Sequence, residues 1–157
     1  MQLQFSKFRK EDFSEYQSWY ADSELNLHLG PMEKDDEWLH AVMQEADGCH
    51  YSVFQGNDLV AVIGVILPDS EHPAYFITDF AVKPTHRGKG IGSDALDELI
   101  KLHPLKPEQM WKTFVDVRNP KAKTFFEKNG WACCPITPNQ DGMIELTFRD
   151  IGSQKDS

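Results

Sequence analysis

Residues 74–92 read Ala-Tyr-Phe-Ile-Thr-Asp-Phe-Ala-Val-Lys-Pro-Thr-His-Arg-Gly-Lys-Gly-Ile-Gly. The stretch joins an apolar run, typical of a buried strand, to a turn and a glycine-rich helix start. Amides in the first turn of a helix have no partner within the helix, and Gly88, Gly90 and Gly92 leave room for an anion to reach them. Arg87 and Lys89 add positive charge, so the turn is suited to bind a pyrophosphate.

Two common phosphate-binding patterns do not match this turn. The P-loop needs Gly-Lys-Ser/Thr after four spacer residues, and the dinucleotide fingerprint needs Gly-x-Gly-x-x-Gly. Glycine is also the default residue of turns, so a turn that binds no ligand stays an alternative.

Hydrophobic periodicity places this turn within an alternation of strands and helices. The sequence predicts strands over residues 3–8, 50–55, 59–67, 74–82, 110–117, 131–136 and 143–148, and helices over residues 11–20, 35–47, 90–102 and 120–129. The order is βααβββαβαββ, in which hairpins and strand-helix-strand crossovers are mixed. This order predicts an α/β fold with a central mixed twisted sheet and helices on both faces.

Length and charge limit the function classes. The 157 residues predict a single domain over residues 1–151 and a loose tail over residues 152–157. The net charge of −9 argues against nucleic acid as a partner. The charge is uneven, because residues 1–47 hold 11 acids and 4 bases while residues 101–157 hold 7 and 9. The two ends are therefore expected to face differently charged ligands.

The remaining composition predicts a cytoplasmic protein with no membrane and no metal partner. The cysteines, Cys49, Cys133 and Cys134, are odd in number and two of them are adjacent, which fits a reducing compartment better than a disulfide framework. No apolar run is long enough for a signal peptide or a membrane span. The histidines show no recurrent metal-ligand spacing.

Two motifs resemble those of the GNAT superfamily of N-acetyltransferases. Residues 87–92, Arg-Gly-Lys-Gly-Ile-Gly, match its Arg/Gln-x-x-Gly-x-Gly/Ala signature, and residues 80–84 match the usual lead-in. Residues 119–131, Asn-Pro-Lys-Ala-Lys-Thr-Phe-Phe-Glu-Lys-Asn-Gly-Trp, are close to its Asn-x-x-Ala-x-x-Phe-Tyr-Glu-Lys-x-Gly-Phe block. The resemblance is specific over residues 74–131 and rests on element order elsewhere. A weaker likeness over residues 16–31 points to the aminoglycoside and ribosomal-protein N-acetyltransferase branch.

The resemblance implies a GNAT fold and acetyl-CoA as cofactor. In the family, backbone amides of the signature hold the coenzyme A pyrophosphate, and the strand before it bonds the pantetheine arm and the acetyl carbonyl. Asn119 matches a position that contacts the cofactor near its thiol, although it would serve equally as a helix cap. The cofactor-binding residues implied are Phe80, Ala81, Val82, Arg87, Gly88, Lys89, Gly90, Ile91, Gly92, Asn119 and Phe126.

One position departs from the family pattern. The tyrosine that often protonates the leaving thiolate is Phe126 here, which has no proton to donate. Another group or a water then protonates the thiolate, or no acid is needed, because a thiol with a pKa near 8–9 is a tolerable leaving group. A plain core aromatic is the alternative role for Phe126.

Removal of a proton from the acceptor amine requires a base. Asp79 is the candidate, because it is the only side chain that is charged at neutral pH in the apolar run from Tyr75 to Val82. Burial there would raise the pKa of its carboxyl towards the range useful for a base. A structural aspartate that bonds nearby backbone or faces solvent is the alternative.

The acceptor is expected to be a cationic amine. In GNAT proteins the N-terminal half carries acceptor specificity, and here that half is acidic and aromatic. The candidate substrate contacts are Trp19, Tyr20 and Glu33, and the wider acidic set includes Asp22, Glu24, Asp35 and Asp36, with His28 beside them. Core packing for Trp19 and solvated helix surfaces for the acids are the alternatives.

The sequence thus predicts direct acetyl transfer from acetyl-CoA to a small-molecule amine or a peptide N-terminus, with no covalent enzyme intermediate. A non-catalytic acyl-CoA sensor on the same fold is the alternative that Phe126 raises. A nucleotide-phosphate binder is a third, disfavoured by the absent P-loop. The edge strands of the predicted sheet could pair with those of a second copy, so a homodimer is an alternative to a monomer.

Overall fold

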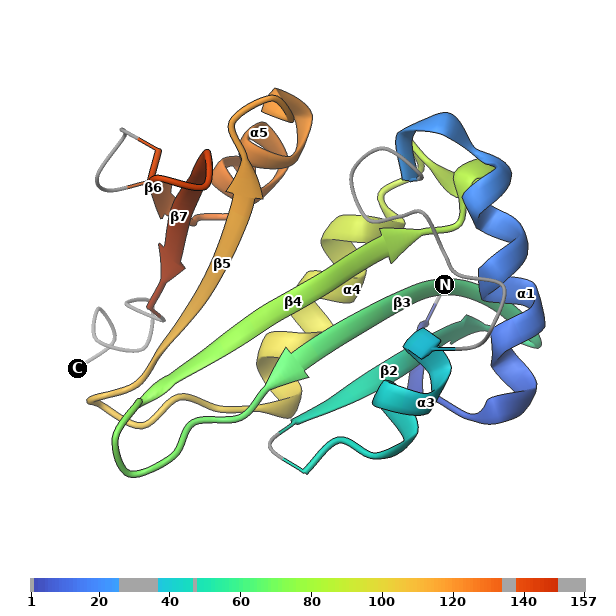
Figure 1. Cartoon of the computed structure of the whole chain (residues 1–157), viewed down its shortest axis with the longest axis horizontal. Coiled ribbons are helices and arrows are strands. Elements are labelled where there is room, and N and C mark those ends of the chain that lie inside the picture. The colour runs from blue at the N-terminus through green and yellow to red at the C-terminus, as the bar shows by residue number, and fades with distance from the viewer. Residues whose placement is uncertain (1, 26–36, 47, 134–137, 150–157) are drawn as a thin grey trace. The chain divides into compact units, whose positions relative to one another are not determined.

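The structure is a computed structural model, and the residues it describes are 2–25, 37–46, 48–133 and 138–149. The elements follow the predicted order, with 3-10 turns added (Figure 1). The strands are β1 (Gln4–Lys7), β2 (Gly48–Gln55), β3 (Asp58–Ile66), β4 (Ala74–Val82), β5 (Met110–Asp116), β6 (Ala132–Cys133) and β7 (Met143–Phe148). The helices are α1 (Phe13–Ser18), α3 (Glu37–Met43), α4 (Ile91–Leu102) and α5 (Pro120–Lys128), with 3-10 helices η1 (Lys10–Asp12), η2 (Trp19–Ala21) and η3 (Pro84–His86).

The strands form one mixed sheet with the hydrogen-bonded order β1-β2-β3-β4-β5-β7-β6. The pairs β1–β2, β2–β3, β5–β7 and β6–β7 are antiparallel, whereas β4 pairs with β5 in parallel. The parallel pair joins Ala74–Ile77 to Met110–Thr113, and α4 lies in the connection between the two strands, as a parallel crossover requires. The predicted α/β mixed sheet is confirmed.

The chain divides into two compact units. The first comprises Met1–Ile66 and Asp79–Leu102, and the second comprises Leu67–Thr78 and His103–Ser157, so that β4 contributes to both. The predicted extent of the domain, 1–151, and the tail, 152–157, end in residues outside the described ranges, and both stay predictions.

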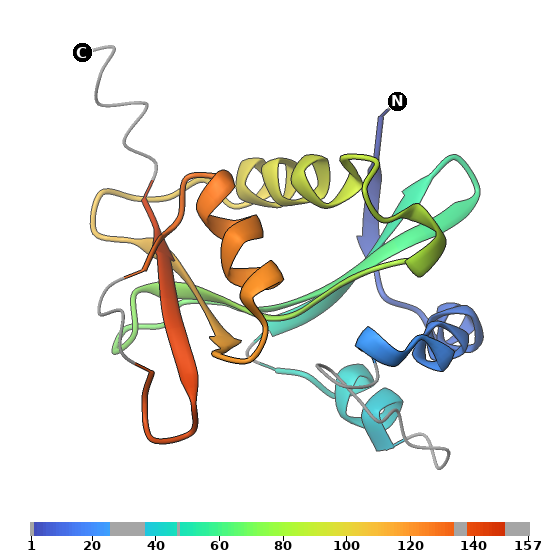
Figure 2. The ribbon, with the colours of Figure 1, turned by 90° about the horizontal axis from the view of Figure 1, so that it is seen from above.

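In the first unit, helices cover both faces of β2–β4. Figure 2 shows α4 on one face and α1 with α3 on the other. The aromatic side chains of the N-terminal helical segment form the core beneath α1 and α3, as the i, i+3, i+4, i+7 spacing predicts. This core contains Phe8, Phe13, Tyr16, Trp19, Tyr20, Leu25, Leu39, Val42, Leu59, Val62 and Ala81.

The helix predicted over residues 11–20 is instead a short α-helix between two 3-10 turns. The 3-10 turn at the N-terminal end of α1 forms around Asp12. The buried carboxylate of Asp12 accepts from the Arg9 backbone amide at 3.0 Å and from the Ser52 hydroxyl at 2.8 Å. That carboxylate is fixed to β2, so the first turn tightens around it. Short 3-10 turns are a common way for α-helices to begin and end.

The two later helices begin where the sequence predicts. α4 buries Ile91, Ala95 and Leu99 as expected, but Leu102 is half exposed because it is the last helical residue, and Leu96 is buried instead. In the second unit, α5 follows Asn119 as N-cap and ends before Gly130, whose φ of 93° is the left-handed conformation that glycine adopts past a helix end.

Candidate active site

The glycine-rich turn leads from β4 through η3 into α4. Gly88 has a φ of 75° and Gly90 a φ of 83°, conformations that side chains disfavour. A Cβ atom on either residue would meet no other atom within 4 Å, so the conformation requires glycine there and crowding does not. Gly90 accepts from the Asp94 amide at 3.0 Å, the first hydrogen bond of a 12-residue helix. The backbone amides just before Asp94 lie at the positive end of the helix dipole, where anions bind.

An ion-pair cluster on the β2–β3 hairpin fixes the start of this turn. The Lys83 amide donates to Val60 at 2.8 Å, and its ammonium group lies 3.1 Å from Asp58 and 3.5 Å from Glu15. His86 Nε2 lies 3.1 Å from the other oxygen of Asp58. The turn is therefore held on both sides of Pro84 before the glycines begin.

Arg87 is paired with the acidic segment that follows η2. Its guanidinium donates to Asp22 at 2.8 Å and lies 3.4 Å from Glu24. The hydrogen bond from Arg87 is the main reason that the pKa of Asp22 is lowered. Two of the acids predicted to lie beside an amine acceptor therefore contact Arg87 of the glycine-rich turn.

The strand segment Phe80–Val82 forms the last three residues of β4. The Ala81 side chain is buried in the core of the first unit, and those of Phe80 and Val82 are partly buried. Among the described residues, the pairing of β4 with β5 ends at Ile77 and Thr113, before this segment. Ile91, the first residue of α4, is also a core residue, and Lys89 is exposed.

Asn119 and Phe126 lie in the second unit. The Asn119 side chain accepts from the Ala122 amide at 3.3 Å, so the cap role considered from the sequence is confirmed. Phe126 is 4% exposed, and its ring centroid lies 4.9 Å from that of Trp131. The structure therefore makes Phe126 a core aromatic.

Asp79 is paired with a buried histidine. Its Oδ2 lies 2.7 Å from His50 Nε2, and a quarter of its side chain is exposed. An ionised carboxylate only accepts hydrogen bonds, so Nε2 is the donor. Glu45 Oε1 lies 2.8 Å from His50 Nδ1, an ion-pair distance, but its approach lacks the direction of a hydrogen bond. Asp79 thus bonds another side chain, an arrangement that neither reading of the sequence considered.

His50 carries a raised pKa. Burial on its own lowers the pKa of the imidazole, but the hydrogen bond to Asp79 and the charges of Asp79 and Glu45 outweigh it, so the pKa lies above its ordinary value of 6.5. One sequence signal for this pairing was Gly64, an isolated glycine in the apolar run over residues 59–67. Such a glycine within a strand indicates that another group approaches the backbone closely. His50 itself has no local signature.

Trp19 and Tyr20, expected to contact the acceptor, are core residues at 4% and 7% exposure. Trp19 Nε1 donates to Glu15 at 2.6 Å, and the Tyr20 hydroxyl lies 2.6 Å from that of Tyr16. Burial raises the pKa of Tyr20 to about 12 and raises the pKa of Tyr16 well above its ordinary value of 10, and the nearby charge of Asp79 adds to both shifts. Their role as acceptor contacts stays a prediction.

Part of the predicted acceptor side lies outside the described residues. It comprises Glu33 together with His28, Asp35 and Asp36.

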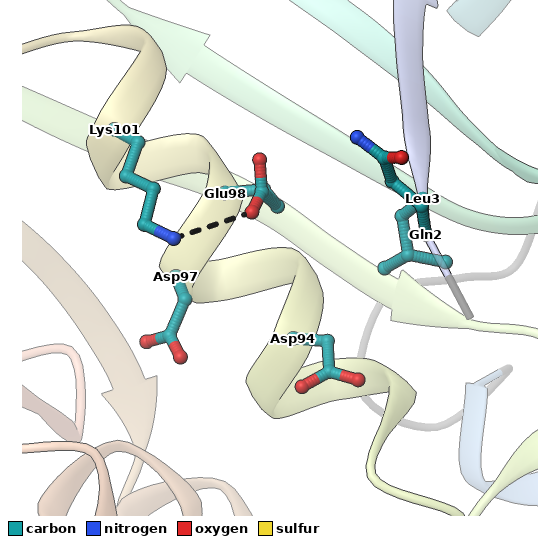
Figure 3. Close-up of a pocket in the computed structure, with 6 residues that line it drawn as sticks. All are labelled: Gln2, Leu3, Asp94, Asp97, Glu98 and Lys101. Carbon is teal, nitrogen blue, oxygen red and sulfur yellow. Dashed lines mark hydrogen bonds and ion pairs between the residues drawn. The ribbon is translucent and has the colours of Figure 1, made fainter.

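A surface hollow is lined by none of the predicted site residues (Figure 3). It is lined by Gln2 and Leu3 at the N-terminus and by four residues of α4, which are Asp94, Asp97, Glu98 and Lys101. Three carboxylates would repel phosphate groups, so this hollow is unsuited to the cofactor.

Over the described residues, no group of three or more His, Cys, Asp or Glu side chains is arranged to hold a metal ion. No helix in the described part of the chain has the length and apolar character needed to cross a membrane.

Comparison with known proteins identifies relatives of the fold. A profile of the acetyltransferase (GNAT) family matches residues 8–131. A search of curated protein sequences found no match.

Solved structures match along nearly the whole chain. An acetyltransferase from Thermus thermophilus is 18% identical, with a TM-score of 0.79 over 94% of this chain and 97% of that one. Spermidine N-acetyltransferase from Vibrio cholerae, solved with CoA and spermine, is 18% identical, with a TM-score of 0.73 over 94% and 95%. The aminoglycoside acetyltransferase AAC(6')-Ib, solved with coenzyme A, is 15% identical, with a TM-score of 0.80 over 98% of each chain. At these identities the likeness establishes the fold alone.

Proposed function

Because the chain belongs to the acetyltransferase (GNAT) family, we propose that it transfers the acetyl group of acetyl-CoA directly to a primary amine of a small cationic molecule or a peptide N-terminus. The observation that carries the proposal is the turn over residues 87–92, where two glycines in left-handed conformations precede the N-terminus of α4. Such a turn presents unpaired amides to a phosphate-rich ligand.

The residues of this turn fit the cofactor that the family uses. The open space above Gly88 and Gly90 suits an anion, and the amides of residues 88–92 would hold the pyrophosphate, because the Arg87 amide already donates to the Pro84 carbonyl at 3.4 Å. The backbone of Phe80–Val82 and the Asn119 amide group are proposed to contact the rest of the cofactor. Acetyl-CoA, when bound, supplies an activated thioester. The relatives from V. cholerae and AAC(6')-Ib were solved with CoA.

Three tasks then fall to the chain. A backbone amide of β4 polarises the thioester carbonyl, which requires no special side chain. Asp79 takes a proton from the acceptor ammonium, so that a neutral amine attacks. The thiolate departs without a proton from Phe126, whose buried ring offers none.

The acceptor class is inferred from charge. The N-terminal segment holds 11 acids against 4 bases, and relatives were solved with the cationic ligands spermine and kanamycin. Asp22 and Glu24 form ion pairs with Arg87. The residues proposed to contact the acceptor are therefore Glu33, Trp19 and Tyr20. We also propose a cytoplasmic location, with a homodimer left as an alternative to a monomer.

A non-catalytic acyl-CoA sensor is the second candidate, favoured by the absence of a hydroxyl at Phe126. The two functions separate in one experiment. Acetyl-CoA is incubated with polyamines, aminoglycosides, amino acids or peptides, and free thiol is measured with and without each amine. An enzyme releases thiol at a rate that depends on amine concentration, whereas a sensor binds acetyl-CoA and releases none.

A further inference from the structure

His50 occupies a position that the proposed reaction does not yet use. Its side chain is 6% exposed and lies between two carboxylates, Asp79 on β4 and Glu45 in the segment that follows α3. The Trp38 ring packs against the imidazole in a T-shaped arrangement, with ring centroids 5.2 Å apart. Among the described residues, Asp79 and Glu45 are the charged groups that face the imidazole. Burial of a charged imidazole costs free energy through lost solvation, and the two neighbouring carboxylates offset that cost.

The sheet brings His50 and Asp79 together across a strand. β3 lies between β2 and β4, and the β3 residue directly opposite His50 is Gly64. Directly opposite residues of neighbouring strands project from the same face of a sheet. Because Gly64 has no side chain, the imidazole of His50 can reach Asp79 across it. A β3 residue with a side chain would lie between the two partners.

The hydrogen bond leaves the two oxygens of Asp79 unequal. Oδ2 accepts from His50 Nε2 at 2.7 Å, while among the described residues Oδ1 has no hydrogen-bond partner. A quarter of the Asp79 side chain is exposed, so solvent reaches this residue.

Resting on the proposed acetylation of an amine, we propose that His50 is a positioning residue that holds Asp79 through Oδ2 and leaves Oδ1 to take the proton from the acceptor. The N–H bond of the ammonium breaks, an O–H bond forms at Oδ1, and the nitrogen keeps the electron pair with which it attacks. The proton later leaves Asp79 to water. Glu45, 2.8 Å from the other ring nitrogen, adds a second negative charge beside the imidazole, and Gly64 keeps the path between His50 and Asp79 open.

The test compares His50→Ala, which removes the donor, with His50→Gln, which keeps an N–H but cannot become charged. His50→Ala should lower kcat by about 10- to 100-fold, the usual cost of a displaced catalytic group. His50→Gln should recover most of this loss. The acid limb of the kcat–pH profile of His50→Gln should move to higher pH, because loss of the positive charge beside Asp79 raises the pKa of that carboxyl. His103→Gln, at a partly buried histidine of the second unit, is the matched control and should change neither.

A purely structural role for His50 predicts another pattern, in which both variants lose kcat together with melting temperature and the acid limb does not move. That pattern would overturn the proposal, as would unchanged kcat in His50→Ala. Gly64→Ala provides a variant with His50 intact, and its kcat should fall towards that of His50→Ala.

A second readout is independent of turnover. NMR titration of the His50 ring should show its pKa falling in Asp79→Asn and in Glu45→Gln, and an unchanged titration in Asp79→Asn would overturn the pairing. If the wild type releases no thiol with any amine, the proposed function fails and the role of His50 fails with it. If the wild type is active and the variants match it, only the role of His50 fails.

Discussion

The guanidinium of Arg87 donates to the carboxylate of Asp22 at 2.8 Å, and this bond connects the glycine-rich turn to a segment 65 residues earlier. The bond is exposed to solvent, so its contribution to the free energy of unfolding is small. Its larger effect is electrostatic, because a negative charge stands beside a turn suited to phosphates.

Replacement of Asp22 by asparagine should tighten acetyl-CoA binding at low ionic strength. The change removes one negative charge near a polyanionic ligand and releases Arg87 to it. Isothermal titration at two salt concentrations measures the effect, which should shrink at high salt. Weaker binding by Asp22→Asn would instead mean that the bond to Asp22 holds Arg87 in its cofactor-binding position.

Gly90→Val should weaken acetyl-CoA binding by at least tenfold, because a side chain would occupy the approach to the amides of the turn. Gly56→Val is the matched control. Gly56 also has a positive φ, 64°, and open space at its Cβ, but it lies in the β2–β3 hairpin turn. Both variants should lose about 1–2 kcal/mol of stability from backbone strain. Equal affinity of the two variants for acetyl-CoA would contradict the placement of the cofactor.

Asn119 is expected to have two separable roles. Asn119→Ala should lower the free energy of unfolding by about 1 kcal/mol through loss of the cap on α5, while Asn119→Asp keeps an oxygen for the Ala122 amide and should not. The proposed cofactor contact needs the amide, so both variants should raise the KM for acetyl-CoA. Urea unfolding and thiol-release kinetics measure the two effects, and a normal KM in both variants would leave Asn119 as a cap alone.

The raised pKa of His50 predicts a pH-dependent contribution to stability. Because the pKa is higher in the folded chain than in the unfolded one, the pair stabilises fully below the unfolded value of about 6.5, and this stabilisation is lost as pH rises through the folded pKa. The difference in unfolding free energy between wild type and His50→Gln should therefore be larger at pH 5.5 than at pH 9. These two pH values lie roughly one unit or more below and above the ordinary histidine pKa. An equal difference at both pH values would exclude a charged His50.

Local patterns in the sequence predicted much of the fold. β4 and β7 have the predicted bounds, and α5 lies between the predicted Asn119 cap and Gly130, because strand alternation, capping and positive-φ glycines are properties of neighbouring residues. The 3-10 turns around α1 were missed, since they depend on Asp12 meeting Ser52 on a distant strand.

The site was predicted less completely for the same reason. The glycine turn is contiguous in sequence, so its residues could be named. The partners of Asp79 and Arg87 are His50 and Asp22, which depend on strand register and on the path of the chain after η2. Neither contact leaves a local pattern. For Phe126, Trp19 and Tyr20, apolar character alone does not distinguish a core side chain from one that lines a site.

The central claim is transfer of an acetyl group to an amine, and thiol release from acetyl-CoA with the amine panel tests it most directly. The account predicts thiol release that saturates with at least one cationic amine, together with a product heavier than that amine by one acetyl group in mass spectrometry. Binding of acetyl-CoA with no amine-dependent thiol release across polyamines, aminoglycosides, amino acids and peptides would contradict it.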